Sequence, residues 1–176
     1  MILSMSSYHF LVKEIPKWDG NYLEIGVWEG DMLRDFAERW PQKTFYGIDP
    51  FLSDCDTTGH TGVPIGQSLD AHRVKANENF NLCPNIEFFE QTSESFSMEH
   101  TNAQLEEMNI SVVYVDGSHT CKNTLIDLDI AARAVKEGLI YVHDYDLPAV
   151  LQATNLFISL NKDRISEHDK HCILLK

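Results

Sequence analysis

The sequence contains no long apolar stretch. None of the hydrophobic runs in its 176 residues reaches the roughly 18 residues that a membrane-spanning helix needs. We therefore expect no membrane partner. The opening MILSMSSYHFLV is apolar, but no basic segment precedes it and no small-residue cleavage site follows it. For that reason we expect a short leading helix over residues 1–18 rather than a signal peptide.

Cysteine is scarce and is not spaced to bind a metal. The four cysteines lie far apart, and none takes part in a CxxC or Cys/His ligand pattern: Cys55, Cys83, Cys121 and Cys172. Disulfide frameworks belong to small secreted proteins, in which the cysteines are dense. The sequence therefore predicts reduced thiols in a cytoplasmic protein.

Positive charge is also scarce. The chain has 14 Lys and Arg against 27 Asp and Glu, which gives a net charge of -13. A polyanion would be repelled by this charge and would gain little from counterion release. We therefore expect no nucleic-acid partner and favour a small-molecule substrate. A homo-oligomer is also compatible with the sequence, since a partner subunit could complete a site.

The chain has no internal repeat, low-complexity tract or linker, so we expect a single domain over residues 1–176. Short β-branched or aromatic runs alternate with helical patterns, which predicts an α/β fold. The expected strands span 21–26, 44–49, 85–91, 111–116, 139–144 and 171–176. The expected helices span 31–40, 67–80, 99–108, 120–136 and 148–160, with Gly138 as the C-cap of the fourth.

One long segment lacks periodicity. Residues 50–66 read PFLSDCDTTGHTGVPIG, and loops of that length in compact domains are commonly functional or mobile. Two interpretations stay open here: a lid over a ligand, and a plain surface insertion.

The first loop limits the kind of ligand. The stretch YLEIGVWEGD runs from a strand through Gly26 into a helix, but Trp28 and Asp31 stand where a GxGxxG pattern needs glycine. Acids at a helix start, here Glu29 and Asp31, stabilise the helix but would repel a pyrophosphate. We expect a nucleoside ligand without phosphate at this loop, and S-adenosylmethionine (SAM) fits. At the end of the next strand, about where an acid should meet ribose hydroxyls, stands Asp49.

Several ordered motifs between residues 20 and 150 carry a family resemblance: LEIGVWEG, FYGIDPF, EQTSESF, VVYVDGSHT and LIYVHDY. With them the chain resembles the class I SAM-dependent methyltransferases, in the branch with EIGVxxG and DGxHxY motifs that is related to sugar O-methyltransferases. The resemblance implies a Rossmann-like, doubly wound open sheet that is mostly parallel, with HCILLK as one antiparallel strand near the edge. It also implies methyl transfer to a small acceptor, often a hydroxyl.

The resemblance further implies which residues contact the cofactor: Glu24, Gly26, Val27, Trp28, Gly30, Asp49, Pro50, Thr92, Ser93 and Asp116. Two departures from the family pattern stand out. Cys121 replaces the usual aromatic residue of DGxHxY. After the third strand, Gln91 precedes Thr92 and Ser93 where related proteins often place an acid near the adenine.

A second group of polar residues follows the fourth and fifth expected strands. If these strands are neighbours, Asp116, His119, His143 and Asp144 face one site. In some relatives, acids at these places bind a divalent metal that orients the acceptor, so Asp116, Asp144 and His143 are candidate ligands for magnesium or manganese. An imidazole there weakens a magnesium site or favours manganese, iron or zinc.

Without a metal, His119 is our first choice as general base and His143 the second, assisted by Asp116. Plainer roles are also open: Asp146 would cap the helix that contains Pro148, and Ser118 or Thr120 would cap the helix before it. Two further functions remain as alternatives. One is a non-catalytic SAM-binding or protein-interaction domain, and the other is a metal-dependent enzyme of different chemistry.

Overall fold

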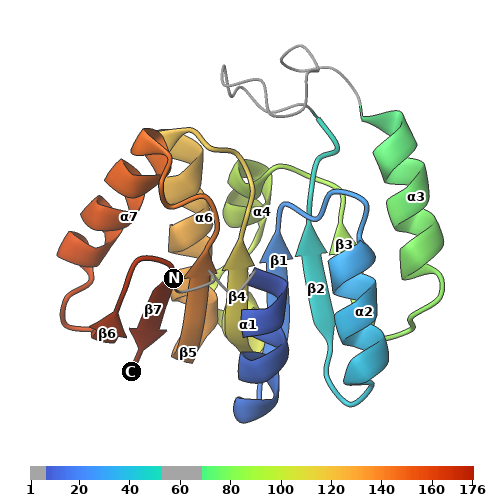
Figure 1. The fold of residues 1–176 in the computed structure, drawn as a ribbon, viewed down its shortest axis with the longest axis horizontal. Coiled ribbons are helices and arrows are strands. Elements are labelled where there is room, and N and C mark those ends of the chain that lie inside the picture. Colours follow the sequence, from blue (N-terminus) through green and yellow to red (C-terminus); the bar gives the residue numbers. More distant parts are fainter. Residues whose placement is uncertain (1–6, 53–68) are drawn as a thin grey trace, which may run out of the picture.

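The computed structural model describes residues 7–52 and 69–176. Its centre is a seven-stranded sheet with the strand order β3-β2-β1-β4-β5-β7-β6 (Figure 1). The strands are β1 (Asn21–Ile25), β2 (Phe45–Ile48), β3 (Ile86–Phe89), β4 (Ile110–Val115), β5 (Val135–Val142), β6 (Ile165–His168) and β7 (Cys172–Leu175). Most of the segment 50–66, for which a lid and a plain surface insertion were both open, lies outside the described residues.

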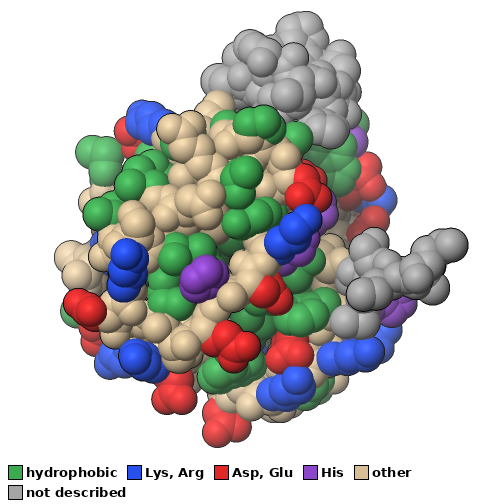
Figure 2. Space-filling view, turned by 60° about the vertical axis from the view of Figure 1, so that its left-hand side comes forward, with side chains coloured by type: hydrophobic (Ala, Val, Ile, Leu, Met, Phe, Trp, Pro, Cys, Tyr) green, Lys and Arg blue, Asp and Glu red, His purple; other side chains and the backbone are tan. Residues whose placement is uncertain are grey.

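The helices are α1 (Ser7–Glu14), α2 (Asp31–Arg39), α3 (Asp70–Phe80), α4 (Ser93–Glu99), α5 (Asn102–Glu107), α6 (Cys121–Ala134) and α7 (Pro148–Leu160), with a 3-10 turn η1 (Ile15–Lys17) after the first. The expected leading helix is therefore present in its described part. Within the described residues, every helix is too short or too polar to cross a lipid bilayer. Acidic and basic side chains are interspersed over the side of the molecule that Figure 2 shows.

The chain order reverses at the middle of the sheet. β1 pairs in parallel with β2 on one side and with β4 on the other. β7 runs antiparallel to both β5 and β6, so the expected doubly wound sheet with one antiparallel strand near its edge is confirmed. The carboxyl ends of β1 and β4 therefore lie side by side at a topological switch point, where open α/β sheets bind ligands.

Helices cover both faces of the sheet because the central strands are apolar on both sides. All six residues of β4 are buried, and from Val112 to Val115 successive side chains enter opposite cores. Val113 joins the core under α4, α5, α6 and α7. Val112 joins the core under α1 and α2, which lie in front of the sheet in Figure 1. Because these strands are buried, the polar residues that follow them are held at the carboxyl edge of the sheet.

Gly138 is not the helix C-cap that the sequence predicts. Helix α6 ends at Ala134, β5 starts at Val135, and Gly138 pairs with Leu175 within the sheet. A Cβ at Gly138 would lie 2.0 Å from the carbonyl oxygen of Ser111. This glycine therefore permits the close approach of β4 and β5 rather than a turn.

Two elements differ from the expected pattern. The window 99–108 is part of two short helices, because Thr101 begins α5 with a capping box to Gln104. The short edge strand β6 has no apolar alternation and was not expected. Asp146 is not an N-cap, since Leu147 takes that position and Asp146 pairs with Lys170. Thr120 does cap α6, as one of the two candidates for that role.

Candidate active site

The sheet register brings the predicted site residues to one edge. Ile25 of β1 pairs with Val115 of β4, and Val115 pairs with Val142 of β5. The next residues along these strands are Gly26, Asp116 and His143. Because parallel strands end at the same edge, the first loop and the second polar group adjoin, as the sequence predicts.

The loop after β1 depends on left-handed backbone. Gly26 has φ 88° and Gly30 has φ 72°, while Trp28 adopts φ 54° despite its side chain. A Cβ on Gly26 would lie 2.0 Å from the carbonyl oxygen of Asp116. Only glycine permits this contact between the first loop and the end of β4.

Asp49, at the end of β2, stabilises the backbone of the first loop. Its Oδ2 accepts hydrogen bonds from the backbone N–H of Val27 at 2.8 Å and of Trp28 at 3.0 Å, and its Oδ1 accepts one from Phe51 at 2.7 Å. Burial raises the pKa of Asp49, although these three donors favour its charged form. The sequence analysis did not predict that Asp49 would accept hydrogen bonds from the loop backbone. The ribose contact of Asp49, and any contact from the half-buried Pro50 beside it, stay predictions.

The acids of the first loop are neutralised from α3. Lys75 forms ion pairs with Glu29 and with Asp31, and His72 Nδ1 lies 2.9 Å from Glu29 Oε1. Hydrogen bonds from Lys75 and then His72 lower the pKa of Glu29. The His72 ring also stacks on Trp28 with 3.9 Å between the centroids. The two acids therefore hold α3 against the loop, in addition to favouring the start of α2.

Glu24, a predicted cofactor contact, points into the protein. Its side chain is 2% exposed, and the hydroxyl of Tyr22 donates to its Oε2 at 3.1 Å. Burial raises the pKa of Glu24 well above its usual range. The structure thus places Glu24 beneath the loop that it was predicted to serve.

At the start of α4, the two predicted adenine contacts have different surroundings. Thr92 is exposed and caps the helix, because its hydroxyl oxygen accepts from the Ser95 N–H at 3.2 Å. Ser93 is the first helical residue and is half-buried. Their contacts with adenine stay predictions.

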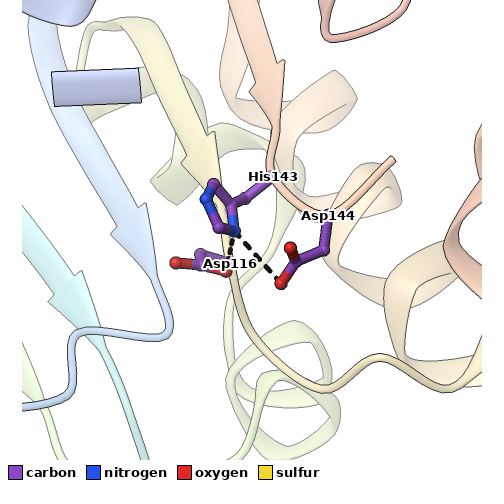
Figure 3. Close-up of side chains that lie close together, drawn as sticks. All are labelled: Asp116, His143 and Asp144. Carbon is purple, nitrogen blue, oxygen red and sulfur yellow. Dashed lines mark ion pairs between the residues drawn. The ribbon is translucent and has the colours of Figure 1, made fainter. Parts of the chain in front are cut away.

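The ends of β4 and β5 carry a compact group of acids and imidazoles, of which Figure 3 shows Asp116, His143 and Asp144. His143 Nδ1 lies 3.0 Å from Asp116 Oδ1 and 3.1 Å from Asp144 Oδ2. His119 Nε2 lies 3.0 Å from the same Oδ2 of Asp144 and 3.9 Å from Asp116 Oδ1. The backbone of Asp144 is left-handed, with φ 47°. The structure therefore gathers all four predicted side chains, and their chemical roles stay predictions.

Opposite charges within this group reinforce one another. The hydrogen bond with Asp116, followed by the charges of Asp116 and Asp144, raises the pKa of His143 to about 9. Burial favours the neutral form of Asp116, but hydrogen bonds from His119 and His143 outweigh it and lower the pKa. Without a metal, His143 is therefore cationic near neutral pH, and an imidazolium cannot accept a further proton.

Tyr114 belongs to the same group and was missed by sequence reasoning. Its hydroxyl donates to Asp116 Oδ2 at 3.0 Å, which leaves Oδ1 facing the imidazoles. The sequence could have indicated this contact, because Tyr114 and Asp116 are two residues apart on one expected strand and such residues lie on the same face of the sheet. Tyr114 orients the carboxylate in the way that outer-shell groups orient metal ligands.

A divalent metal fits the residues present. One ligand atom from each of Asp116, His143 and Asp144 lies within 4.8 Å of the other two. Two carboxylate oxygens and one imidazole nitrogen suit manganese, iron or zinc better than magnesium, which prefers oxygen. The donor set agrees with the ligands predicted from the sequence.

Comparison with protein families shows which family the chain belongs to. The family model described as a methyltransferase domain matches residues 23–145. The chain belongs to this family. The matched segment runs from β1 to just beyond β5, so it contains the first loop and the acid–imidazole group described above. Comparison with curated proteins gives no match.

Solved structures show the same class I methyltransferase fold. CalS11, a calicheamicin methyltransferase, superposes with a TM-score of 0.66 at 17% identity over 97% of this chain and 77% of that chain. Its apo structure, described as a TDP-rhamnose 3'-O-methyltransferase, gives 0.56 at 20% identity with the same coverage. A fibrillarin/Nop5p complex gives 0.50 at 14% identity over 89% of this chain and 71% of that chain. Identities this low support the fold alone.

Proposed function

We propose that this methyltransferase moves the methyl group of SAM to a hydroxyl of a small acceptor, such as a sugar or another metabolite. The observation that carries the proposal is the contact between the glycine loop of β1 and the end of β4, which joins a nucleoside-type loop to the acid–imidazole group. CalS11 is described as a TDP-rhamnose 3'-O-methyltransferase, so sugars are the first acceptors to test. A cytoplasmic location, and the absence of a nucleic-acid substrate, remain part of the proposal.

The cofactor would lie along the carboxyl edge of β1, β2 and β4. The proposed contacts are those predicted from the sequence: Glu24, Gly26, Val27, Trp28, Gly30, Asp49, Pro50, Thr92, Ser93 and Asp116. Glu24 would act from beneath the loop, because it is buried. Asp49 would meet the ribose with the lone pairs that its three backbone donors leave free.

Without a metal, His119 is the proposed general base. Methyl transfer is an in-line displacement, so the acceptor oxygen must be held about 3 Å from the methyl carbon and lose its proton during attack. In this scheme the proton passes to the His119 imidazole. Asp144, whose Oδ2 is 3.0 Å from His119 Nε2, would stabilise the imidazolium that forms.

A divalent metal is the competing use of the same residues. Asp116, His143 and Asp144 would hold it, and manganese fits this donor set better than magnesium. Such an ion supplies charge that orients an acceptor hydroxyl and lowers its pKa. Tyr114 would keep Asp116 in the ligating orientation through its hydrogen bond to Oδ2.

Calorimetry with S-adenosylhomocysteine (SAH) tests the cofactor, and a panel of hydroxylated sugars with labelled SAM tests the transfer. We expect SAH binding in the micromolar range, about -8 kcal/mol. A folded protein that gives no binding signal would remove the proposal. Binding without turnover on any acceptor, with or without manganese, would instead support a non-catalytic SAM-binding domain.

A further inference from the structure

A carboxylate lies unpaired in the middle of α6. Asp127 is 1% exposed, and among the described residues neither of its carboxylate oxygens has a hydrogen-bond partner of normal geometry. Burying an acid in this way is costly. Buried groups left unsatisfied in a native structure are commonly tied to ligand binding or catalysis.

The carboxylate touches the loop after β4 from below. A Cβ on Gly117 would lie 2.8 Å from Asp127 Oδ2, so the carboxylate occupies the space where another residue would carry its side chain. Gly117 directly follows Asp116, at the edge where β1 and β4 meet. Asp127 therefore supports the loop that joins β4 to α6 and that carries His119.

The same carboxylate is close to the start of α4. Burial raises the pKa of Asp127 to about 7, and the nearby Ser93 hydroxyl and the charge of His119 oppose this shift only in part. Ser93 is half-buried and is the first residue of α4, which packs against α6. Asp127 therefore lies near a hydroxyl on the proposed adenine side of the site, without a hydrogen bond of normal geometry to it.

Asp129, two residues further along α6, has none of these properties. Its side chain is 62% exposed and pairs with Arg133 at 3.6 Å. The two acids share a helix, a charge and a size, but only Asp127 is buried and lies against the loop after β4. Asp129 is therefore a matched control.

We propose that Asp127 is a positioning residue for recognition of the adenine base. In the ligand-bound protein its carboxylate would accept a hydrogen bond from the Ser93 hydroxyl, which would leave the Ser93 oxygen only lone pairs to offer the ligand. A hydroxyl has one donor and two acceptor positions, so Ser93 held in this way accepts a hydrogen bond from the 6-amino group of adenine. The 6-oxo group of hypoxanthine has no proton to donate to it. The inference rests on the proposed SAM site.

Calorimetric titration with SAH and with S-inosylhomocysteine, which differ at that position, tests the proposal. We expect the wild-type protein to prefer SAH by about tenfold, the factor for roughly one hydrogen bond. Asp127→Asn should reduce the preference to about twofold or less, because an amide also donates to Ser93. Asp129→Asn should keep the wild-type preference.

A second variant covers the case in which Asp127→Asn does not fold. Ser93→Ala should lose the preference to the same degree, and in the double variant the two losses should not add. The proposal is overturned if the wild type binds both ligands equally, if Ser93→Ala or folded Asp127→Asn keeps the preference, or if Asp127→Asn weakens both ligands by one factor. Absence of binding to either ligand in the wild type would refute the SAM site itself.

Discussion

The free energy of unfolding of the Asp127→Asn variant, relative to that of the wild type, should increase as the pH rises. Burial raises the folded-state pKa of this carboxyl from 3.8 to about 7. The unfolded chain releases the proton near its ordinary value, whereas the folded protein holds it until about pH 7. The protonated carboxyl therefore contributes stability that is fully present below the unfolded-state pKa. This contribution is lost as the pH rises through the folded-state pKa.

The size of the effect follows from the two pKa values. Between pH 5 and pH 7 only the folded state binds the proton, so the free energy of unfolding falls by about 1.4 kcal/mol per pH unit. Over those two pH units the free energy of unfolding of the wild type falls by about 3 kcal/mol, and a variant with an uncharged side chain at this position avoids this fall. The asparagine amide has its own burial cost, but this cost does not vary with pH.

Urea unfolding followed by circular dichroism at pH 5, 6, 7 and 8 measures this difference. The stability of Asp127→Asn minus that of the wild type should increase by about 3 kcal/mol between pH 5 and pH 8. Asp129→Asn should follow the wild type, because its side chain is exposed. Parallel pH profiles for Asp127→Asn and the wild type would refute the reasoning, since they would mean that Asp127 is already charged in the folded protein at pH 5.

Three further predictions concern the proposed chemistry. His119→Ala should lower kcat by about 100-fold while the Kd for SAH, from calorimetry, changes by less than about twofold; equal losses in both would contradict a role as base. Manganese should bind about tenfold more tightly than magnesium, and Asp144→Asn should weaken manganese binding in a calorimetric titration, whereas the exposed Asp146→Asn should not. Gly26→Ala should destabilise the protein by about 1–3 kcal/mol in urea unfolding and weaken SAH binding, because its Cβ would meet Asp116; a variant with wild-type stability would contradict the observed loop.

Most of the fold could be predicted from the sequence because its central strands are apolar on both faces. The run in β4 is buried at every position, and such runs leave few alternatives to a covered parallel sheet. The edge strand β6 escaped prediction for the opposite reason, since three of its four residues are exposed. Gly138 was misassigned because a glycine after a helix is usually a C-cap, whereas this one meets Ser111 on a neighbouring strand.

The candidate site was predictable where it follows from strand ends. Asp116 and His143 stand directly after neighbouring parallel strands, so their proximity needed only the strand order. The contacts of Lys75 with Glu29, 46 residues apart, have no local signal. The same holds for Asp127, which sequence reasoning did not single out: nothing in an amphipathic helix distinguishes a buried acid from an exposed one until the helix is packed.

Stability and recognition should change in opposite directions when Asp127 is replaced, and this separates a positioning role from a structural one. An acid retained to hold the fold together would be paired, and its loss would lower both stability and ligand binding. Asp127 has no well-formed partner among the described residues, so its charged form works against folding above pH 7. If Asp127→Asn is relatively more stable at pH 8 and yet fails to distinguish SAH from S-inosylhomocysteine, the carboxylate is retained for the ligand. If the variant is less stable and keeps the distinction, Asp127 is a structural residue and the connection through Ser93 does not exist.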